Sequence, residues 1–422
     1  AATVGLDGLS DEEWIARFGR FTPFDGSLPE PLALRYHGHQ FRNYNPDIGD
    51  GRGFLYAQLR EREGRLLDFG TKGSGQTPYS RFGDGRLTLK GGMREILASE
   101  MLEALGVTTS RTFSIIETGE ALERHDEPSP TRAAVLVRLS HGHIRIGSFQ
   151  RLFALQEPEH LARLIAYSLR HLYGVEPDAE PALQLYRLVV ARCADLAASY
   201  MVAGFVHGVL NTDNIAITGE SFDYGPWRFA PHWDEGFTAA YFDHQGLYAF
   251  GRQPEAIHWN LAQLAVALAG ITQEQPLVEA FHSYADLYQT AFDQRFLWRL
   301  GLASDDEGLS RTLVAASVGA MAASGVAIDR FFFDWRGGRT VDGERYDPAI
   351  WTDARALVER CVPVPGALDH SYWHGEPCSM LIDEVEALWS AIDTADDWGP
   401  VEAKVAAIRA MGAAHATFGG TA

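Results

Sequence analysis

The pattern of hydrophobic residues changes once along this chain, near residues 139 to 148, and this change constrains the fold. Before it, residues 53 to 60 alternate between apolar and polar side chains, the chain turns at Glu63-Gly64, and a second run ends at Lys72. This pattern predicts a β-hairpin with Lys72 at the end of its second strand. Two further β-rich runs lie at residues 112 to 118 and 133 to 139. The first part of the chain is therefore expected to be mostly sheet.

Helical spacing dominates the rest of the chain. One helix is already expected within the β-rich part, over residues 93 to 105, because apolar residues recur there at helical spacing and Gly106 follows as a C-cap. Beyond Ser148 the same spacing predicts helices over residues 161 to 172, 185 to 196, 257 to 268 and 277 to 292. The predicted fold class is α+β, with a β-rich N-terminal part over residues 1–140 and an α-rich part over residues 141–422.

Charge and cysteine content limit the partners. Lys and Arg number 36 against 56 Asp and Glu, and the formal net charge of -20 argues against a nucleic-acid partner, because phosphate backbones are bound by Lys and Arg. The 3 cysteines are too few for a disulfide framework and favour a reducing compartment, so we expect a cytoplasmic protein. The start shows no secretory signal, and the longest apolar stretch, residues 313 to 328, is dominated by Ala, Gly and Ser. We therefore expect no membrane partner.

A lysine among glycines is the first candidate phosphate ligand. Lys72 precedes Gly73-Ser74-Gly75, where small residues let a phosphate approach the backbone. Glu95, on the helix expected next, is the natural carboxylate to hold the ammonium group in place. The alternative is that both residues lie on the surface and never meet.

A second segment offers acidic and amide oxygens. Asp213-Asn214 follows a helix expected to end at Gly204 and precedes a short strand expected over residues 215 to 218, after which a turn at Gly219-Glu220 leads to Asp223. Such a hairpin would bring Asn214 and Asp223 together as ligands of a magnesium ion that bridges phosphates. Asp213 would remain free to accept a proton from an attacking hydroxyl. The alternative is that these residues only form turns.

Two Gly-Asp-Gly-Arg tetrads and two further arginines could complete a polyphosphate site. The tetrads run from Gly49 to Arg52 and from Gly83 to Arg86, and each presents backbone donors beside a guanidinium group. Arg138 and Arg145 flank Ser140-His141-Gly142-His143, where the hydrophobic pattern changes. A solvated surface charge is the alternative for any one of these arginines.

Two histidine-containing segments resemble metal sites only weakly. His37 and His39 have no thiol or carboxylate at ligand spacing, so we expect them to make structural hydrogen bonds. The other segment offers zinc-type ligands but only one thiol, and it contains Pro377; its candidate ligands are His370, His374, Glu376 and Cys378.

Six blocks of this sequence together resemble the selenoprotein O (SelO) family. They are Arg35 to Phe41 (RYHGHQF), Gly49 to Phe54 (GDGRGF), Lys72 to Arg86 (KGSGQTPYSRFGDGR), Arg94-Glu95, Arg138 with Arg145, and His207 to Pro226 (HGVLNTDNIAITGESFDYGP). The blocks are long and occur in the family's order over roughly residues 30 to 260.

The resemblance implies a protein-kinase-like bilobal fold that transfers AMP, rather than phosphate, from ATP to Ser, Thr or Tyr hydroxyls of proteins, with Mg²⁺ or Mn²⁺. It implies a nucleotide inverted relative to ordinary kinases, with the α-phosphorus facing the acceptor. Lys72 matches the family's phosphate-binding lysine, Glu95 its ion-pair partner and Asp213 its proton acceptor. Positions that match magnesium ligands are Asn214 and Asp223. Positions that match other nucleotide ligands are Gly49, Gly51, Arg52, Asp84, Gly85, Arg138 and Arg145.

The chain departs from the family pattern in places. Arg42 stands where a glycine is expected, and Gly91-Gly92 precede Arg94 where bulkier or hydroxylated residues are usual. Beyond about residue 350 the chain does not align with the family's usual tail. Cys378 lies far from the C-terminus, whereas some members carry a terminal redox-active Cys or selenocysteine, so the sequence gives no basis for assigning redox regulation to this tail.

Two other functions remain open at this point. One is an ordinary phosphotransferase, which would transfer the γ-phosphate instead of AMP. The other is a non-catalytic ATP-binding pseudokinase scaffold, although such a scaffold has no need of Asp213, Asn214 and Asp223 together.

Overall fold

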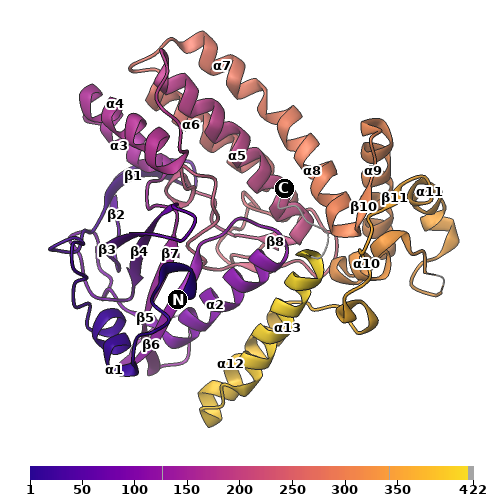
Figure 1. Cartoon of the computed structure of the whole chain (residues 1–422), viewed down its shortest axis with the longest axis horizontal. Helices are drawn as coiled ribbons and strands as arrows, with labels where there is room; N and C mark the ends of the chain where they lie inside the picture. Colours follow the sequence, from indigo (N-terminus) through magenta and orange to yellow (C-terminus); the bar gives the residue numbers. More distant parts are fainter. Residues whose placement is uncertain (126, 342, 417–422) are drawn as a thin grey trace.

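A five-stranded antiparallel sheet organises the first third of the chain in the computed structural model, which describes residues 1–125, 127–341 and 343–416. The strand order is β3, β4, β7, β5, and β6 also pairs with β7 (Figure 1). The strands are β3 (Leu55–Arg60), β4 (Leu66–Lys72), β5 (Leu87–Thr88), β6 (Arg111–Leu122) and β7 (Thr131–Ser140). The predicted hairpin that ends at Lys72 and the two predicted β-rich runs are confirmed.

The pairing of β4 with β7 brings two candidate cations close together. Lys72 pairs with Leu136, and Gly70 pairs with Arg138. Since side chains two residues apart on a strand share a face, Lys72 and Arg138 project from the same face at diagonal positions.

A separate hairpin, β1 (Arg35–Gln40) with β2 (Asn43–Gly49), lies beside this sheet. Gln40 pairs with Asn43, so Phe41 and Arg42 form a two-residue turn, and both have positive φ, 49° and 63°. This left-handed conformation costs a non-glycine residue of order 1 kcal/mol. Arg42 therefore occupies a position where the family's glycine would be unstrained.

Helix α2 (Leu89–Ala104) packs against β6 and β7 and carries Glu95. The Thr88 hydroxyl caps it by accepting the Gly91 N–H at 3.1 Å, so the helix begins four residues before the predicted start. A Cβ on Gly92 would lie 2.3 Å from Ile115 Cδ1 of β6. The glycine pair in the first turn thus lets α2 approach the sheet closely. The predicted helix over residues 93 to 105 is otherwise confirmed.

Helices make up most of the chain after β7. They are α3 (Ile146–Ala154), α4 (Pro158–Tyr167), α5 (Pro181–Ala203), α6 (Gln253–Leu268), α7 (Glu274–His282), α8 (Tyr284–Leu300), α9 (Glu307–Ser324), α10 (Ile328–Asp334), α11 (Pro348–Val358), α12 (Ile382–Ala395) and α13 (Gly399–Ala416). Short segments complete the order: α1 (Asp11–Trp14), β8 (Phe205–Val206), β9 (Arg228–Phe229), β10 (Leu302–Ala303) and β11 (Val362–Pro363). Figure 1 shows α5, α6, α7 and α8 on the side of the molecule away from α1 and β6. The fold is therefore mixed α and β, as predicted.

The structure corrects two element predictions. The helix predicted over residues 277 to 292 is two helices, α7 and α8, because the chain breaks at Ser283, whose hydroxyl donates to the Ala280 carbonyl at 2.7 Å. The predicted strand over residues 215 to 218 is absent from the described chain. Ala216, inside the predicted strand, pairs with Arg145, and Ser221, beyond the predicted turn, pairs with Thr109. The hairpin that was expected to bring Asn214 and Asp223 together therefore does not form.

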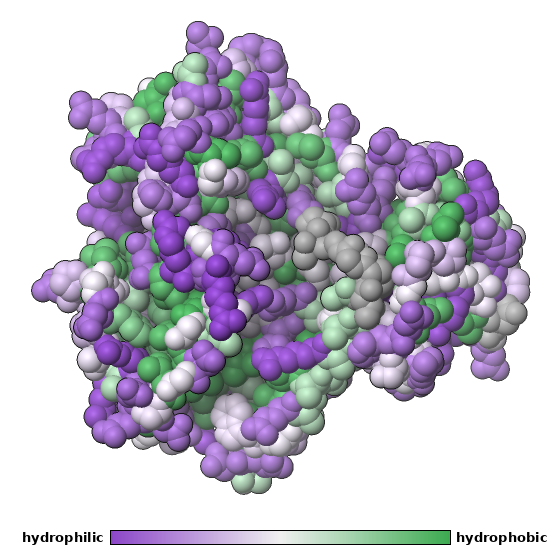
Figure 2. All heavy atoms as spheres, viewed as in Figure 1, coloured by the Kyte–Doolittle hydropathy of each residue, from purple (hydrophilic) through white to green (hydrophobic). Residues whose placement is uncertain are grey.

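The core extends from the sheet side into the helical part. Helix α5 is buried over most of its length and packs against α6 and α8, and it shares one hydrophobic cluster with Met93 and Leu97 of α2. Figure 2 shows hydrophilic residues over most of the protruding surface of one face, with hydrophobic residues mainly recessed between them. Among the described helices, none combines the length and the apolar character that crossing a bilayer requires.

The last two helices, α12 and α13, pack against the outer side of α2 (Figure 1). Two ion pairs fasten them there: Lys90 with Glu386 of α12 at 2.7 Å, and Glu100 with Arg409 of α13 at 2.5 Å. The C-terminal helices thus support the helix that carries Glu95.

Candidate functional site

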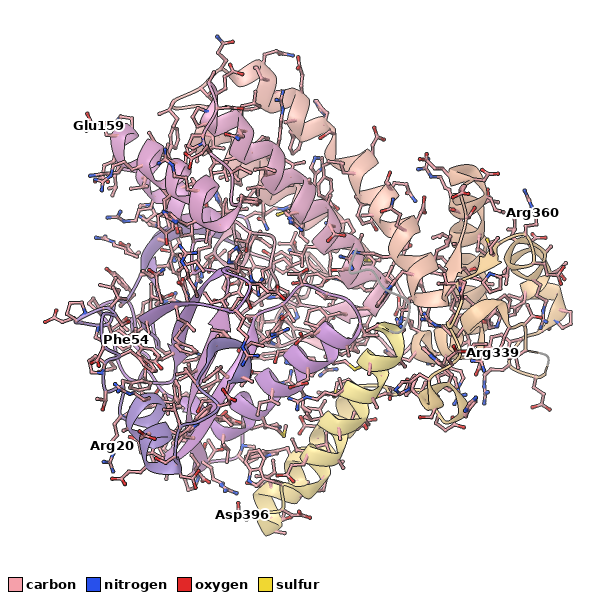
Figure 3. The ribbon with its side chains drawn as sticks, viewed as in Figure 1. Arg20, Phe54, Glu159, Arg339, Arg360 and Asp396 are labelled. Atoms are coloured by element: carbon pink, nitrogen blue, oxygen red, sulfur yellow. The ribbon has the colours of Figure 1, made fainter. Side chains whose placement is uncertain are left out.

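A cavity of about 660 Å³ lies where the sheet, the β1–β2 hairpin and the loop around residues 205 to 225 meet, a size typical of small-molecule sites. Phe54, labelled in Figure 3, belongs to its wall on the sheet side. The predicted site residues in its wall are Gly49, Gly51, Arg52, Lys72, Asp84, Gly85, Arg138, Arg145, Asp213 and Asp223. Neither Glu95 nor Asn214 is among the wall residues, although Glu95 contacts the wall residue Lys72.

Lys72 joins the sheet to two carboxylates. Its ammonium group donates to Glu95 Oε1 and lies 2.8 Å from Asp223 Oδ1. The side chains of Lys72 and Glu95 are only 7% and 2% exposed, so this ion pair is shielded from water. The structure therefore brings Lys72 and Glu95 into direct contact, and Glu95 fixes the ammonium group at the cavity wall.

Arg138 and Arg145 add two buried cations to the same wall. Arg138 Nη2 lies 3.4 Å from Glu95 Oε1 and 3.4 Å from Asp223 Oδ1. Arg145 Nη1 donates to the Asp213 carbonyl at 3.0 Å. The Nε atoms of both arginines are buried without a hydrogen-bond partner among the described residues. The guanidinium groups themselves line the cavity and suit an anionic ligand, because their planar N–H donors match phosphate oxygens.

The Arg145 guanidinium is positioned by two rings and a carboxylate. Its central carbon lies 4.3 Å from the Tyr36 ring centre and 4.9 Å from that of Phe222. Its Nη2 lies 3.3 Å from Asp50 Oδ1. Because the group is held on several sides, its direction toward the cavity is fixed.

Asp213 is a buried carboxylate at the cavity wall. It lies on the short 3₁₀ turn Thr212–Asn214, and its Oδ1 is buried without a hydrogen-bond partner among the described residues. Burial raises its pKa from 3.8 to about 6, and the positive charge of Arg145 opposes that rise. A carboxylate with such a pKa is mostly ionised at neutral pH yet basic enough to accept a proton, as a general base requires.

Asp223 has the opposite electrostatics. Burial alone would raise its pKa, but Lys72, Arg138 and Arg145 together hold that pKa well below its usual range. Its backbone lies in the left-handed region, with φ of 62°. Asp223 is therefore a permanently ionised carboxylate in a constrained conformation.

Asp223 and Asn214 are residue types that suit magnesium, which keeps several waters and binds phosphate oxygens. Asp223 supplies an ionised carboxylate. Asn214 donates its side-chain N–H to the Val209 carbonyl at 2.9 Å, which leaves its amide oxygen as the remaining acceptor. No group of three His, Cys, Asp or Glu ligands occurs in the described parts of the chain. One carboxylate and one amide oxygen suit a phosphate-bridging magnesium ion better than an all-protein cage.

The two Gly-Asp-Gly-Arg tetrads lie at the cavity because their glycines allow close backbone contacts. A Cβ on Gly49 would lie 2.5 Å from the Tyr79 ring, and one on Gly85 would lie 2.2 Å from the Gly75 carbonyl carbon. Asp84 pairs with Arg124 at 2.8 Å. The loop around residues 79 to 86 is thereby held against the first tetrad.

Several wall residues were not predicted, among them Tyr36, Gln40 and Tyr79. Strand β1 contained a signal for two of them, because residues 36, 38 and 40 share one face of a strand. A Cβ on Gly38 would lie 2.8 Å from Asp213 Oδ1, so this face of β1 touches the candidate base directly.

The predicted structural role of His37 and His39 is confirmed. His37 Nδ1 lies 2.6 Å from the Tyr44 hydroxyl, and His39 Nδ1 accepts from Gln150 at 2.8 Å.

Two of the weak zinc-ligand candidates near residue 374 interact with other residues. His370 Nδ1 accepts the Tyr372 N–H at 3.1 Å, and Glu376 pairs with Arg330. Cys378 is buried.

Comparison with known proteins gives the family. The family model described as protein adenylyltransferase SelO matches residues 1–354. A protein nucleotidyltransferase YdiU of Synechocystis sp. is 43% identical over 420 residues, which cover 93% of this chain and 87% of the relative. One of Gloeobacter violaceus is 43% identical over 428 residues, covering 94% and 85%, and one of Pseudomonas putida is 41% identical over 306 residues, covering 72% and 62%. This chain therefore belongs to the protein adenylyltransferase SelO family.

Proposed function

We propose that the cavity binds ATP and that AMP passes from it to Ser, Thr or Tyr hydroxyls of proteins. Membership in the family makes the chain a protein adenylyltransferase, which agrees with the activity expected from the sequence. The observation that carries the site assignment is the convergence of Lys72, Arg138 and Arg145 on one cavity wall that also holds Asp213 and Asp223. Three fixed cations in a protein of net charge -20 are suited to a triphosphate.

The proposed arrangement is bilobal and kinase-like. Residues 1–140, with the sheet and α2, would form one lobe, and residues 141–422 the other, with the nucleotide between them. Lys72 and Arg138 would hold phosphate oxygens from the sheet side, and Arg145 from the boundary between the lobes. The glycines at positions 49, 51 and 85 would let the nucleotide approach the backbone, with Arg52 and Asp84 beside it. The inverted nucleotide implied by the family would turn its α-phosphorus toward the acceptor.

The proposed reaction is an in-line displacement at the α-phosphorus. The acceptor oxygen forms the new P–O bond, the bond between the α- and β-phosphates breaks, and pyrophosphate leaves. Asp213 takes the proton of the attacking hydroxyl. Asp223 and the amide oxygen of Asn214 would hold Mg²⁺, or Mn²⁺, which would neutralise phosphate charge. Glu95 keeps Lys72 directed at the phosphates.

The proposed partners are ATP and proteins that carry hydroxyl acceptors, with no nucleic-acid or membrane partner. A cytoplasmic location rests on the cysteine content, since Cys193, Cys361 and Cys378 are all free and buried.

Position-specific labelling tests the reaction. The protein is incubated with Mg²⁺ and ATP labelled at the α- or the γ-phosphate, and intact mass is measured in parallel. We expect only the α-label on protein, with the mass gain of AMP. Asp213→Asn should bind ATP but lose transfer, and Asp223→Ala should lose metal-dependent ATP binding. Incorporation of the γ-label alone would make the chain a phosphotransferase, and no incorporation would favour the pseudokinase scaffold.

A further inference from the structure

Two adjacent aromatic side chains project into solvent after the candidate metal-binding segment. Tyr241 is 77% and Phe242 is 42% exposed. Their rings meet at 5.1 Å between centres, and the Phe242 ring lies 5.9 Å from Phe41. We call these three residues the aromatic platform. Exposed aromatic clusters contribute little to a core and are typical of interaction surfaces.

The platform is tied to the segment that carries Asp213. The Phe41 N–H donates to Asn211 Oδ1 at 3.0 Å, and the Tyr248 hydroxyl donates to the same oxygen at 2.6 Å. The Phe41 and Tyr248 rings lie 5.1 Å apart. Asn211 stands two residues before Asp213, so the residue that anchors Phe41 belongs to the same short segment as the candidate base.

The backbone conformation of Phe41 determines the direction of its ring. Phe41 has φ of 49°, a conformation that a bulky residue adopts rarely. The strained turn is held by the bond to Asn211, and it presents the Phe41 ring to Phe242. The two-residue hairpin turn requires this conformation, so the turn fixes where the Phe41 ring lies.

The platform lies within reach of a polypeptide bound at Asp213. Gly38 lies against Asp213, because a Cβ added at Gly38 would be only 2.8 Å from Asp213 Oδ1. Phe41 follows three residues later. Three residues span at most about 10 Å, so Phe41 lies within that distance of Gly38. A segment whose hydroxyl sits at Asp213 can therefore place a side chain three or four positions away on the platform.

We propose that the aromatic platform docks the acceptor polypeptide, which binds in extended form with an apolar side chain within four residues of the modified hydroxyl. This inference rests on the proposed function and names a recognition element of its protein substrate. The neighbouring charges do not oppose such a ligand, because Arg42 beside the platform is already paired with Glu255 at 3.1 Å. Aromatic residues are frequent hot spots in such interfaces.

Synthetic peptides test the proposal. Each peptide carries one Ser, Thr or Tyr acceptor in a Gly/Ala/Lys background, with or without one Phe at each position from four before to four after it. Transfer from α-labelled ATP is measured for the wild type, Tyr241→Ser and the double variant Tyr241→Ser/Phe242→Ser. We expect Phe to raise kcat/KM about tenfold at one or two positions in the wild type, and the double variant to lose this preference. The ATP dissociation constant and the unfolding temperature of Tyr241→Ser should stay unchanged.

Val362→Ser is the matched control. Val362 is 65% exposed, and Arg360, two residues before it, lies on the opposite side of the molecule from Phe54 of the cavity wall (Figure 3). This variant should keep the full peptide preference. Equal transfer to all peptides, or a preference that survives in the double variant, overturns the docking surface alone. If the wild type transfers no α-label to any peptide or protein, the adenylyl-transfer assignment fails, and this inference fails with it.

Discussion

Replacing Asp213 with Asn should remove most of the activity and stabilise the protein at the same time. General-base catalysis contributes roughly 10²- to 10⁴-fold, so Asp213→Asn should lower kcat by about that factor. In the wild type, kcat/KM for ATP, which reports the free enzyme, should rise with pH through about 6 and then level off, since the pKa of Asp213 is about 6 and only its ionised form accepts a proton. The variant's residual rate should lack this dependence. Initial rates with α-labelled ATP between pH 4.5 and 8 measure both effects.

The stability effect follows from the same carboxylate. Its pKa rises on folding from 3.8 to about 6, so the native state binds the proton more tightly than the unfolded state does. The contribution of Asp213 to stability is therefore greatest below pH 4, falls between pH 4 and 6, and above pH 6 is lower by about 3 kcal/mol. Because the Asn side chain stays neutral, the free energy of unfolding of Asp213→Asn should exceed that of the wild type by about 2–3 kcal/mol at pH 7 and by almost nothing near pH 4. Urea unfolding of the nucleotide-free protein at both pH values measures this.

An exposed carboxylate provides the control. Asp305 lies on the surface, so Asp305→Asn should change neither rate nor stability. If Asp213→Asn keeps its activity, Asp213 is not the proton acceptor. A loss of stability at pH 7, or an equal gain at both pH values, would refute the claim that a buried, ionised carboxylate strains the native state.

Three further predictions follow from the site and its supports. Glu95→Gln should leave Lys72 without its buried anchor and raise the ATP dissociation constant at least tenfold, as calorimetry would show; unchanged affinity would exclude the anchoring role. In Asp223→Asn, ATP affinity should become insensitive to EDTA, whereas the wild type should bind ATP more weakly once the metal is removed; equal EDTA sensitivity in both would argue against a metal at this carboxylate. Gly53→Ala should destabilise the fold by about 1–3 kcal/mol, because its Cβ would lie 2.0 Å from a backbone oxygen. Gly319→Ala in α9, which has open space around it, is the control and should stabilise the fold by up to about 1 kcal/mol. Equal shifts of the two unfolding temperatures in thermal melts would contradict this contrast.

The spacing of apolar residues correctly predicted those parts of the site that depend on residues close together in the sequence. The alternating pattern that ends at Lys72 predicted strand β4, and the apolar residues at helical spacing beside Glu95 predicted helix α2. Lys72 and Glu95 meet because α2 packs on the sheet. The strand expected over residues 215 to 218 failed because Ala216 and Ser221 find their partners in Arg145 and Thr109, far away in the sequence. Propensity cannot show which distant segment will pair.

Residues that act through tertiary position were harder to predict. Tyr36 supports Arg145 from a strand more than a hundred residues earlier, and nothing near Tyr36 in sequence indicates that partner. The break at Ser283 was hidden for a different reason. Apolar residues continue at helical spacing across it, so periodicity alone predicts one long helix from α7 into α8.

The packing of α12 and α13 on α2 makes the end of the chain part of the nucleotide machinery. The family model stops at residue 354, yet these later helices cover the outer side of the helix whose inner side presents Glu95. Without α13, the outer side of α2 would be exposed to water and α2 would be less firmly held against the sheet. The contact between the Glu95 carboxylate and Lys72 would then weaken. The packing of α12 and α13 therefore stabilises the position of α2, and with it the contact between Glu95 and Lys72, although neither helix lines the cavity.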